Sequence, residues 1–466
     1  MVNKKNFLKN FSYTFSSNII TFLLNAIILL LLPKILNTSD FGYFQYYMVV
    51  VGFTIYMHFG WIDGIYLRYS GNSYEEIDKS IFSGQFKALM VFGVIQFIIL
   101  LSILLLLPIE VNKKYAIFIA IIAIMFMIPK IFTYVLMQVT SRFKEYSIIL
   151  IIEKLVFSLL LVAFILAGVR SYSVFILADL IGRATSAAYG IYVCRDLLKT
   201  KAASLKENFN EFYKNFKSGI FIMIANISSI LVVSVVQFII EHNWSIETFG
   251  KVSLALNISK AVLIVISAIG IIVFPMLKKV AAEYQPSIFK NVRTVLLPIL
   301  FIMMLGYFPA TILVNYWLPN YKSSIAFLMI LFPFFVFESK TALLLNTYFK
   351  LLRYEKKLAL INTISVVLSL MLSVMTAYVF NSLYGTVMVI LLAVGLRSLM
   401  LELFIIKKLK VKKNYTIFLE ILLVVLFIIV NMFLSFSISF IIYSISLSLY
   451  VYVFKNNIYQ ALKHVR

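Results

Sequence analysis

Residues 86–107 read FKALMVFGVIQFIILLSILLLL, an apolar run whose only charge is Lys87. A hydrocarbon core about 30 Å thick is crossed by about 20 apolar residues in an α-helix. A second run follows at 115–138, after a short gap that holds Lys113 and Lys114. This part of the sequence therefore predicts two membrane-spanning helices joined by a short loop.

The rest of the chain repeats this pattern on both sides of the pair. Of the 466 residues, 62% are hydrophobic and 13% are charged, against roughly half and a quarter in soluble domains. We predict an all-α fold, a polytopic transmembrane helical bundle of about fourteen spans. Twelve spans plus a re-entrant pair is the alternative, because 415–454 holds no strong break. The predicted spans are 13–33, 42–64, 86–107, 115–138, 147–169, 172–194, 218–240, 250–275, 293–317, 323–348, 358–380, 384–406, 415–432 and 436–454.

The positions of the basic residues orient this bundle. Most of the 42 Lys and Arg residues fall at the two ends of the chain and in every second gap between spans. Because short cytoplasmic loops carry the excess of Lys and Arg, both termini are predicted to be cytoplasmic. The net charge of +23 then faces an anionic leaflet, and no nucleic-acid partner is needed to explain it. The opposite side holds six basic residues: Lys34, Lys113, Lys114, Arg170, Lys251 and Lys322.

Several kinds of chemistry are disfavoured by what the sequence contains. The single cysteine, Cys194, excludes a disulfide framework, and three scattered histidines exclude a His-based metal cluster. The sequence has no GxxxxGK[ST] loop for a nucleotide. We therefore predict no metal, no cofactor and no enzyme activity.

Similar residues recur 208 positions apart in the sequence, and each pair occupies the same place relative to the predicted spans. This pattern predicts an internal repeat that divides the chain into two halves. Six spans separate the copies, so the halves would be related by an axis along the membrane normal. Chance matching in a chain rich in few residue types is the alternative. The matching features are Phe41-Gly42 with Phe249-Gly250, Gln138 with Asn346, Arg142 with Lys350, and Tyr146 with Tyr354.

The repeat suggests four parts of the chain. Residues 1–200 would form an N-terminal six-helix lobe and 218–411 a C-terminal six-helix lobe, pseudo-symmetric to the first. Residues 201–217 would form an amphipathic cytoplasmic linker, because Leu205, Phe209, Phe212 and Phe216 recur there at helical spacing. A plain linker resting on the headgroups is the alternative. Residues 412–466 would form a C-terminal transmembrane hairpin and a cytoplasmic tail.

Several stretches resemble the multidrug/oligosaccharidyl-lipid/polysaccharide (MOP) exporter superfamily, and most of all its polysaccharide repeat-unit flippase branch, the type that serves O-antigen or capsule synthesis. The resemblance covers essentially the whole chain. It implies two lobes around a central cavity that opens alternately to each side. It also implies a polyprenyl-pyrophosphate-linked oligosaccharide as the substrate. The stretches that carry it are LPKILNTSDFGYFQYY at 32–47, HFGWIDGIYLRYSG at 58–71, IVFPMLKK at 272–279 and NTYFKLLRYEKK at 346–357.

We interpret five of the cations inside predicted spans as candidate substrate-binding residues. A charge within hydrocarbon is costly, so such residues usually face a bundle interior or a watery cavity and mark a pathway. In a cavity they would attract a pyrophosphate. They are Lys260, Arg183, Arg397, Lys130 and Lys340.

Pairing with carboxylates inside the protein is the alternative interpretation of these cations. Asp179 precedes Arg183 by four residues and so lies on the same helical face. Lys340 is close in sequence to Glu338, and Arg397 is five residues before Glu402, whereas Lys260 has no acidic neighbour in its own span. The sequence therefore predicts Lys260 as the strongest candidate.

Other polar residues could line the cavity or take part in gating. Asp63, near the end of the second span, is a candidate for gating or ion coupling, and Asp179 and Glu338 share that candidacy. Asn18 and Asn25 are seven residues apart and share one face. They could bind sugar hydroxyls, or they could hold helices together.

We therefore predict a flippase that moves a lipid-linked oligosaccharide from the cytoplasmic to the outer leaflet of a bacterial plasma membrane. Its partners would be the lipid bilayer and a polysaccharide polymerase or glycosyltransferases. An ion-coupled multidrug exporter of the same superfamily is the alternative. A membrane glycan polymerase or ligase is disfavoured because the outer gaps are short.

Overall fold

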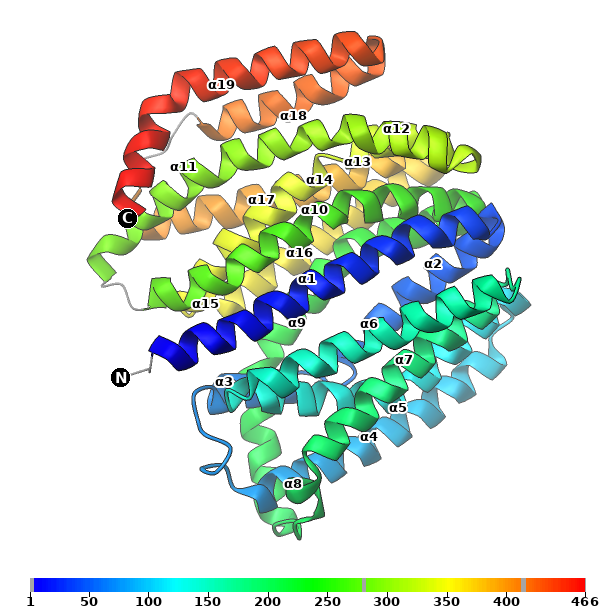
Figure 1. Cartoon of the computed structure of the whole chain (residues 1–466), viewed down its shortest axis with the longest axis vertical. Helices are drawn as coiled ribbons and strands as arrows, with labels where there is room; N and C mark the ends of the chain where they lie inside the picture. Colours follow the sequence, from blue (N-terminus) through cyan, green and yellow to red (C-terminus); the bar gives the residue numbers. More distant parts are fainter. Residues whose placement is uncertain (1–3, 279–281, 412–415, 466) are drawn as a thin grey trace. The chain divides into compact units, whose positions relative to one another are not determined.

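The computed structural model describes residues 4–278, 282–411 and 416–465. Within those ranges the chain forms helices and no strand. It divides into two compact units, Met1–Ile227 and Ser228–Arg466, whose boundary lies inside helix α9 (Leu205–Asn243) (Figure 1). The predicted lobe limits and the central cavity stay predictions.

The first unit contains the helices that precede α9 and the first part of α9 itself. They are α1 (Lys4–Ile35), α2 (Thr38–Phe53), α3 (Trp61–Tyr69), α4 (Lys79–Leu106), α5 (Val111–Val139), α6 (Phe143–Leu166), α7 (Tyr172–Val193) and the short α8 (Arg195–Lys199). Among them α5, α6 and α7 pack against one another, and α1 packs along α6.

The second unit contains the rest of α9 and ten further helices. They are α10 (Ile246–Lys278), α11 (Gln285–Met303), α12 (Tyr307–Trp317), α13 (Ser324–Leu331), α14 (Phe334–Lys340), α15 (Asn346–Leu351), α16 (Glu355–Val374), α17 (Leu383–Leu409), α18 (Thr416–Phe433) and α19 (Phe436–Val465). π-Helical turns at Thr341–Leu345 and Met375–Val379 join α14 to α15 and extend α16.

The prediction of an all-α polytopic membrane protein is confirmed. Every one of the fourteen predicted spans falls on a described helix or on consecutive described helices. Eleven helical segments in the described part are long and apolar enough to cross a membrane, and the bent pair α2 and α3 makes a twelfth. The other two predicted spans correspond to α10 and α18, and α18 and α19 are separate helices joined at Leu434 and Ser435.

The segment predicted as the second span, 42–64, is bent in the structure. The segments Thr38–Tyr56 and Trp61–Tyr69 meet at 55°. Phe59 and Gly60 between them have φ angles of +48° and +83°. These left-handed conformations end one helix before the next begins.

The glycines beside this bend bring α3 against α9. A Cβ atom on Gly64 would lie 1.8 Å from the Asn215 carbonyl oxygen, and one on Gly219 would lie 2.1 Å from the Gly60 oxygen. Both distances are far below van der Waals contact, so only glycine fits at these positions. The predicted amphipathic linker is thus the first part of α9, and one of its faces packs on protein. Contact between its other face and lipid stays a prediction.

Side chains hold this part of α9 in place. Arg68 of α3 forms an ion pair with the buried Glu211, and its guanidinium also donates to Asn215 Oδ1 at 2.6 Å. The ring of Trp61 lies 4.4 Å from that of Phe212. Glu211 and Phe212 thus point toward α3. This face of α9 contacts protein rather than the lipid headgroups.

The predicted repeat is visible where α2 and α10 begin. Phe41 N–H donates to the Asn37 carbonyl at 3.0 Å, and 208 residues later Phe249 N–H donates to the Ser245 carbonyl at the same distance. Asn37 and Ser245 also cap their helices with a side-chain oxygen. The offset of 208 therefore matches local structure at this joint.

The offset is different at the second joint of the repeat. Ser141 and Arg353 both have φ +59° and are 212 residues apart. The residue after each donates its N–H to the carbonyl five residues earlier, at 2.8 and 2.9 Å. The π-helical turn Thr341–Leu345 inserts an additional residue upstream and accounts for part of this shift. Three predicted matches are thus wrong by about one helical turn: Gln138 with Asn346, Arg142 with Lys350, and Tyr146 with Tyr354.

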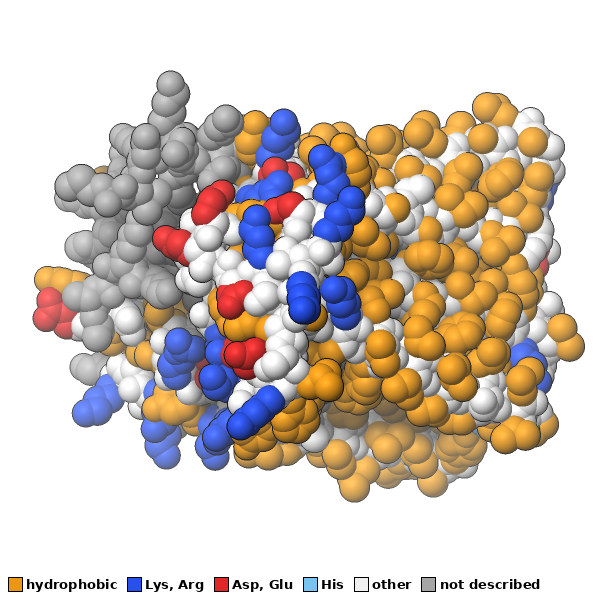
Figure 2. All heavy atoms as spheres, turned by 90° about the horizontal axis from the view of Figure 1, so that it is seen from below, with side chains coloured by type: hydrophobic (Ala, Val, Ile, Leu, Met, Phe, Trp, Pro, Cys, Tyr) orange, Lys and Arg blue, Asp and Glu red, His pale blue; other side chains and the backbone are white. Residues whose placement is uncertain are grey.

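The exposed surface fits a membrane environment. On the face drawn in Figure 2, Lys and Arg side chains gather in one band, and hydrophobic side chains cover the broad area beside it. Along α4, Val91, Ile98 and Leu105 are 61%, 56% and 66% exposed and seven residues apart. That spacing puts them on one helical face, which is suited to contact lipid.

Cysteine labelling tests the predicted orientation. Single cysteines at Lys113 and Lys322 in a Cys194→Ser background should react with an impermeant thiol reagent added outside intact cells, whereas cysteines at Lys201 and Lys410 should not. The native Cys194 is buried, so it should react little in any background. If only the cysteines at positions 201 and 410 react, the orientation in the membrane is opposite to the predicted one.

Candidate functional site

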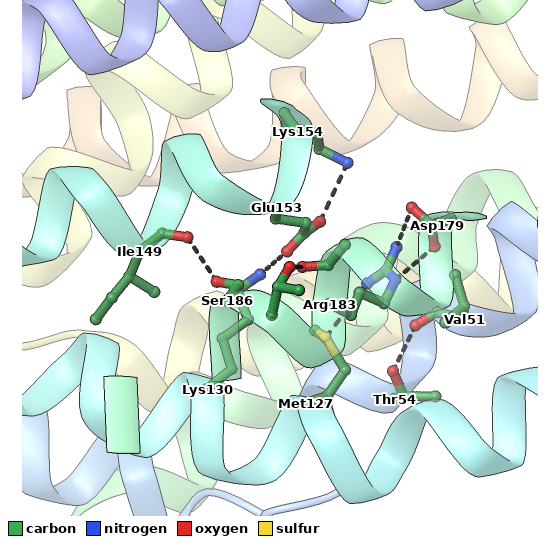
Figure 3. Close-up of polar contacts among 12 residues, drawn as sticks. Val51, Thr54, Met127, Lys130, Ile149, Glu153, Lys154, Asp179, Arg183 and Ser186 are labelled. Atoms are coloured by element: carbon green, nitrogen blue, oxygen red, sulfur yellow. Dashed lines mark hydrogen bonds and ion pairs between the residues drawn. The ribbon is translucent and has the colours of Figure 1, made fainter. Parts of the chain in front are cut away.

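The first unit contains a buried carboxylate held between two lysines. Glu153 of α6 forms an ion pair with Lys130 of α5, and its other oxygen lies 3.1 Å from Lys154 Nζ (Figure 3). The side chain of Glu153 is 6% exposed, and those of Lys130 and Lys154 are 11% and 19% exposed. A buried carboxylate needs such partners, because an unpaired charge there would be costly.

A second ion pair lies on α7, beside the first. Arg183 Nε donates to Asp179 Oδ2 at 2.6 Å, and Tyr47 Oη of α2 donates to the same oxygen at 2.8 Å. Asp179 is fully buried. Figure 3 shows Lys130, Glu153 and Arg183 side by side, and Ser186 Oγ ties α7 to the Ile149 carbonyl of α6 at 2.6 Å.

We call these five charged residues the first-unit cluster: Lys130, Glu153, Lys154, Asp179 and Arg183. Three cations face two carboxylates, which leaves one positive charge in excess when all are ionised. Arg183 stands near the middle of the 22-residue α7, a depth at which transporters commonly hold their substrates. In this low-dielectric setting the excess charge favours an anion.

The second unit contains a smaller group with the same imbalance. Arg397 of α17 forms an ion pair with Glu338 of α14, and its guanidinium donates to Ser229 Oγ of α9 at 2.6 Å. Lys260 of α10 also interacts electrostatically with Glu338. We call Lys260, Glu338 and Arg397 the Glu338 group. Two cations share one carboxylate, and both Lys260 and Arg397 lie near the middle of their helices.

A third cluster is electrically balanced and fully buried. Arg293 of α11 and Lys340 of α14 are held by Glu402 of α17 and Glu420 of α18. Lys340 Nζ lies 2.7 Å from Glu402 and 2.9 Å from Glu420. The four side chains are between 0% and 8% exposed. We call this the neutral cluster, and its geometry suits a joint between helices rather than a binding site.

The structure pairs these residues differently from the sequence-based alternative. Asp179 and Arg183 form the expected pair, because residues four apart share a helical face. The other two partners are exchanged: Glu338 binds Arg397, and Glu402 binds Lys340. Residues two or five apart on one helix point in different directions. Lys340 and Arg397 therefore pair with carboxylates of neighbouring helices rather than of their own.

Several members of these clusters were missed from the sequence. Glu153, Glu420, Lys154 and Arg293 are not among the predicted site residues, although Lys154 and Arg293 fall within predicted spans. Lys154 lies eleven residues after α6 begins, and Arg293 lies eight after α11 begins. The signal was a carboxylate inside an apolar run, as in IILIIEKLVF and TIFLEILLVV, which implies an internal partner.

The remaining predicted site residues lie apart from the clusters. Asp63 is in the first turn of α3, with one carboxylate oxygen 3.9 Å from His58 Nε2. Asn18 and Asn25 are half-buried on α1. Roles in gating or sugar binding stay predictions for all three.

The comparisons with known proteins place the chain. A family model described as "Polysaccharide biosynthesis protein" matches residues 7–281. The chain belongs to this family. Its fold is the one shared by the MOP superfamily, so the resemblance drawn from its motifs is confirmed at that level. A search of curated proteins found no sequence match.

Two solved structures illustrate the shared fold. The chain is similar to a lipid II flippase, MurJ, in an inward closed conformation, with a TM-score of 0.61 and 14% identity over 96% of this chain and 99% of that one. It is also similar to an inward-facing multidrug resistance MATE family transporter, with a TM-score of 0.60 and 12% identity over 86% of this chain and 96% of that one. At such identities the likeness concerns the fold alone.

Proposed function

We propose that the chain is a flippase that moves a polyprenyl-pyrophosphate-linked oligosaccharide from the cytoplasmic to the outer leaflet of a bacterial plasma membrane. Membership of a polysaccharide biosynthesis family supports this class of cargo. The observation that carries the proposal is the excess of buried positive charge in the first-unit cluster and in the Glu338 group. Such charge needs an anionic ligand.

The proposed cargo carries matching charge. A pyrophosphate esterified at both ends has two acidic groups, and an excess of positive charge in either charge group would attract such an anion. The headgroup would bind from the cytoplasmic side while the polyprenyl tail stays in lipid. Transport would follow by alternating access, and the headgroup could shift the balance of conformations only through different affinity for each. No covalent bond would change.

A multidrug exporter is the second candidate, and the fold shared with a MATE transporter supports it. Organic cations, however, would be repelled by an excess of buried lysine and arginine. The two candidates therefore differ in the charge of the cargo. Anionic lipid headgroups should bind and organic cations should not.

Reconstituted vesicles test the proposal directly. The purified protein should flip a fluorescent polyprenyl-pyrophosphate oligosaccharide between leaflets, with accessibility read by an impermeant quencher. Protein-free vesicles and vesicles loaded with a cationic dye serve as controls. Export of the dye without movement of the lipid would favour the multidrug reading and end the flippase proposal.

A further inference from the structure

We infer that Glu338 is a built-in competitor of the substrate: its carboxylate pairs with Arg397, also attracts Lys260, and must yield these cations to the pyrophosphate. This inference rests on the proposed function and adds a residue that sets affinity and release. It concerns the second unit alone.

The contacts of Arg397 support this role. Its side chain is 1% exposed, and one of its terminal nitrogens donates to Glu338 while the other donates to Ser229 Oγ at 2.6 Å. The third nitrogen, Nε, is buried and has no hydrogen-bond partner in the described part of the chain. A guanidinium has five N–H donors in a fixed fork that suits phosphate oxygens. Arg397 thus holds a donor in reserve that a larger anion could use.

The exposure of Glu338 supports its displacement. The Glu338 side chain is 21% exposed although its partner Arg397 is almost completely covered. Part of its side chain is therefore not enclosed by protein, and it can move away from Arg397 when an anion takes its place more easily than a fully enclosed carboxylate could. Glu402 and Glu153 are 0% and 6% exposed and each contacts two cations, so they lack this freedom.

Competition by the Glu338 carboxylate would help the protein release the pyrophosphate during transport. A site with two unopposed cations would hold a pyrophosphate tightly on both sides of the membrane and release it slowly. A carboxylate that can return to Arg397 and Lys260 lowers the affinity and helps expel the headgroup. Glu338 would then act as a specificity-determining residue, since only an anion that exceeds one carboxylate in charge can displace it.

The variant Glu338→Gln tests this inference, because removing this charged residue should strengthen rather than weaken substrate binding. It removes the competing charge at nearly constant shape, so binding of a short-chain isoprenyl pyrophosphate to the purified protein should tighten about tenfold, which is the effect of one charge-assisted hydrogen bond. Turnover in vesicles should fall, because release is slower. Glu338→Asp, whose carboxylate is withdrawn by one methylene, should lie between the wild type and Glu338→Gln.

The matched control is Glu355→Gln, the same change at the start of α16 in the same unit, where the carboxylate lies 3.7 Å from the exposed Arg353. It should leave binding within about twofold. Unchanged or weaker probe binding by folded Glu338→Gln protein overturns the inference, as does equal tightening by the control. If Glu338→Gln does not accumulate, Glu338→Asp decides alone. Wild-type protein that neither binds the probe nor flips lipid would instead refute the proposed function.

Discussion

Replacing Lys340 with alanine is expected to remove most of the folded protein, not to act on transport as such. In the neutral cluster this change leaves Glu402 and Glu420 with Arg293 as their shared cation. Removing one partner of a buried ion pair typically costs about 3–5 kcal/mol. A loss of that size approaches the whole stability of many proteins.

The measurement is thermal unfolding of the protein in detergent, together with the amount that elutes as a single folded species. A charge-balanced double variant, Lys340→Met with Glu402→Gln, is the control. It should recover much of the loss, because neutral side chains of similar volume can replace a buried ion pair at small cost. Lys340→Ala protein that is as stable as the wild type but inactive would return Lys340 to the substrate pathway.

The contrast between Lys340 and Lys260 shows how far sequence reasoning carries. Because a charge in hydrocarbon is rare enough to stand out, counting charges within apolar runs found five of the seven cations in these groups, but it missed Lys154 and Arg293. The partners could not be assigned, because helices that are distant in sequence supply them. Glu420 of α18 lies 80 residues from Lys340, and no local spacing indicates that contact.

The same limit applies to the fold. Span positions follow from hydropathy, which is a local property, and all fourteen fall on helices. The bend in the second span depends on left-handed φ angles at Phe59 and Gly60. In sequence, Gly60 could equally have been an ordinary packing residue, and its role becomes clear only where Ile220 lies against it. Tertiary contact, rather than local preference, decided these details.

Replacing Lys260 with alanine is expected to abolish most transport while the protein still folds. Lys260 is half-buried near the middle of α10, and its electrostatic partner Glu338 also has Arg397. Removal of Lys260 therefore leaves Glu338 paired, unlike the loss of Lys340 from its cluster. The loss of one charge-assisted contact to pyrophosphate should weaken headgroup capture by about ten- to a hundredfold.

Flipping of the labelled lipid should be measured in vesicles at equal amounts of folded protein. Lys260→Arg should retain much of the activity, since the charge is kept although its geometry differs. Lys251→Ala, near the start of the same helix, should be close to wild type. The double variant Lys260→Ala with Glu338→Gln should stay poorly active, because removal of the competing carboxylate does not restore the missing cation. Wild-type flux in Lys260→Ala, or full rescue by Glu338→Gln, would mean that Lys260 serves only to balance Glu338 and makes no contact with the substrate.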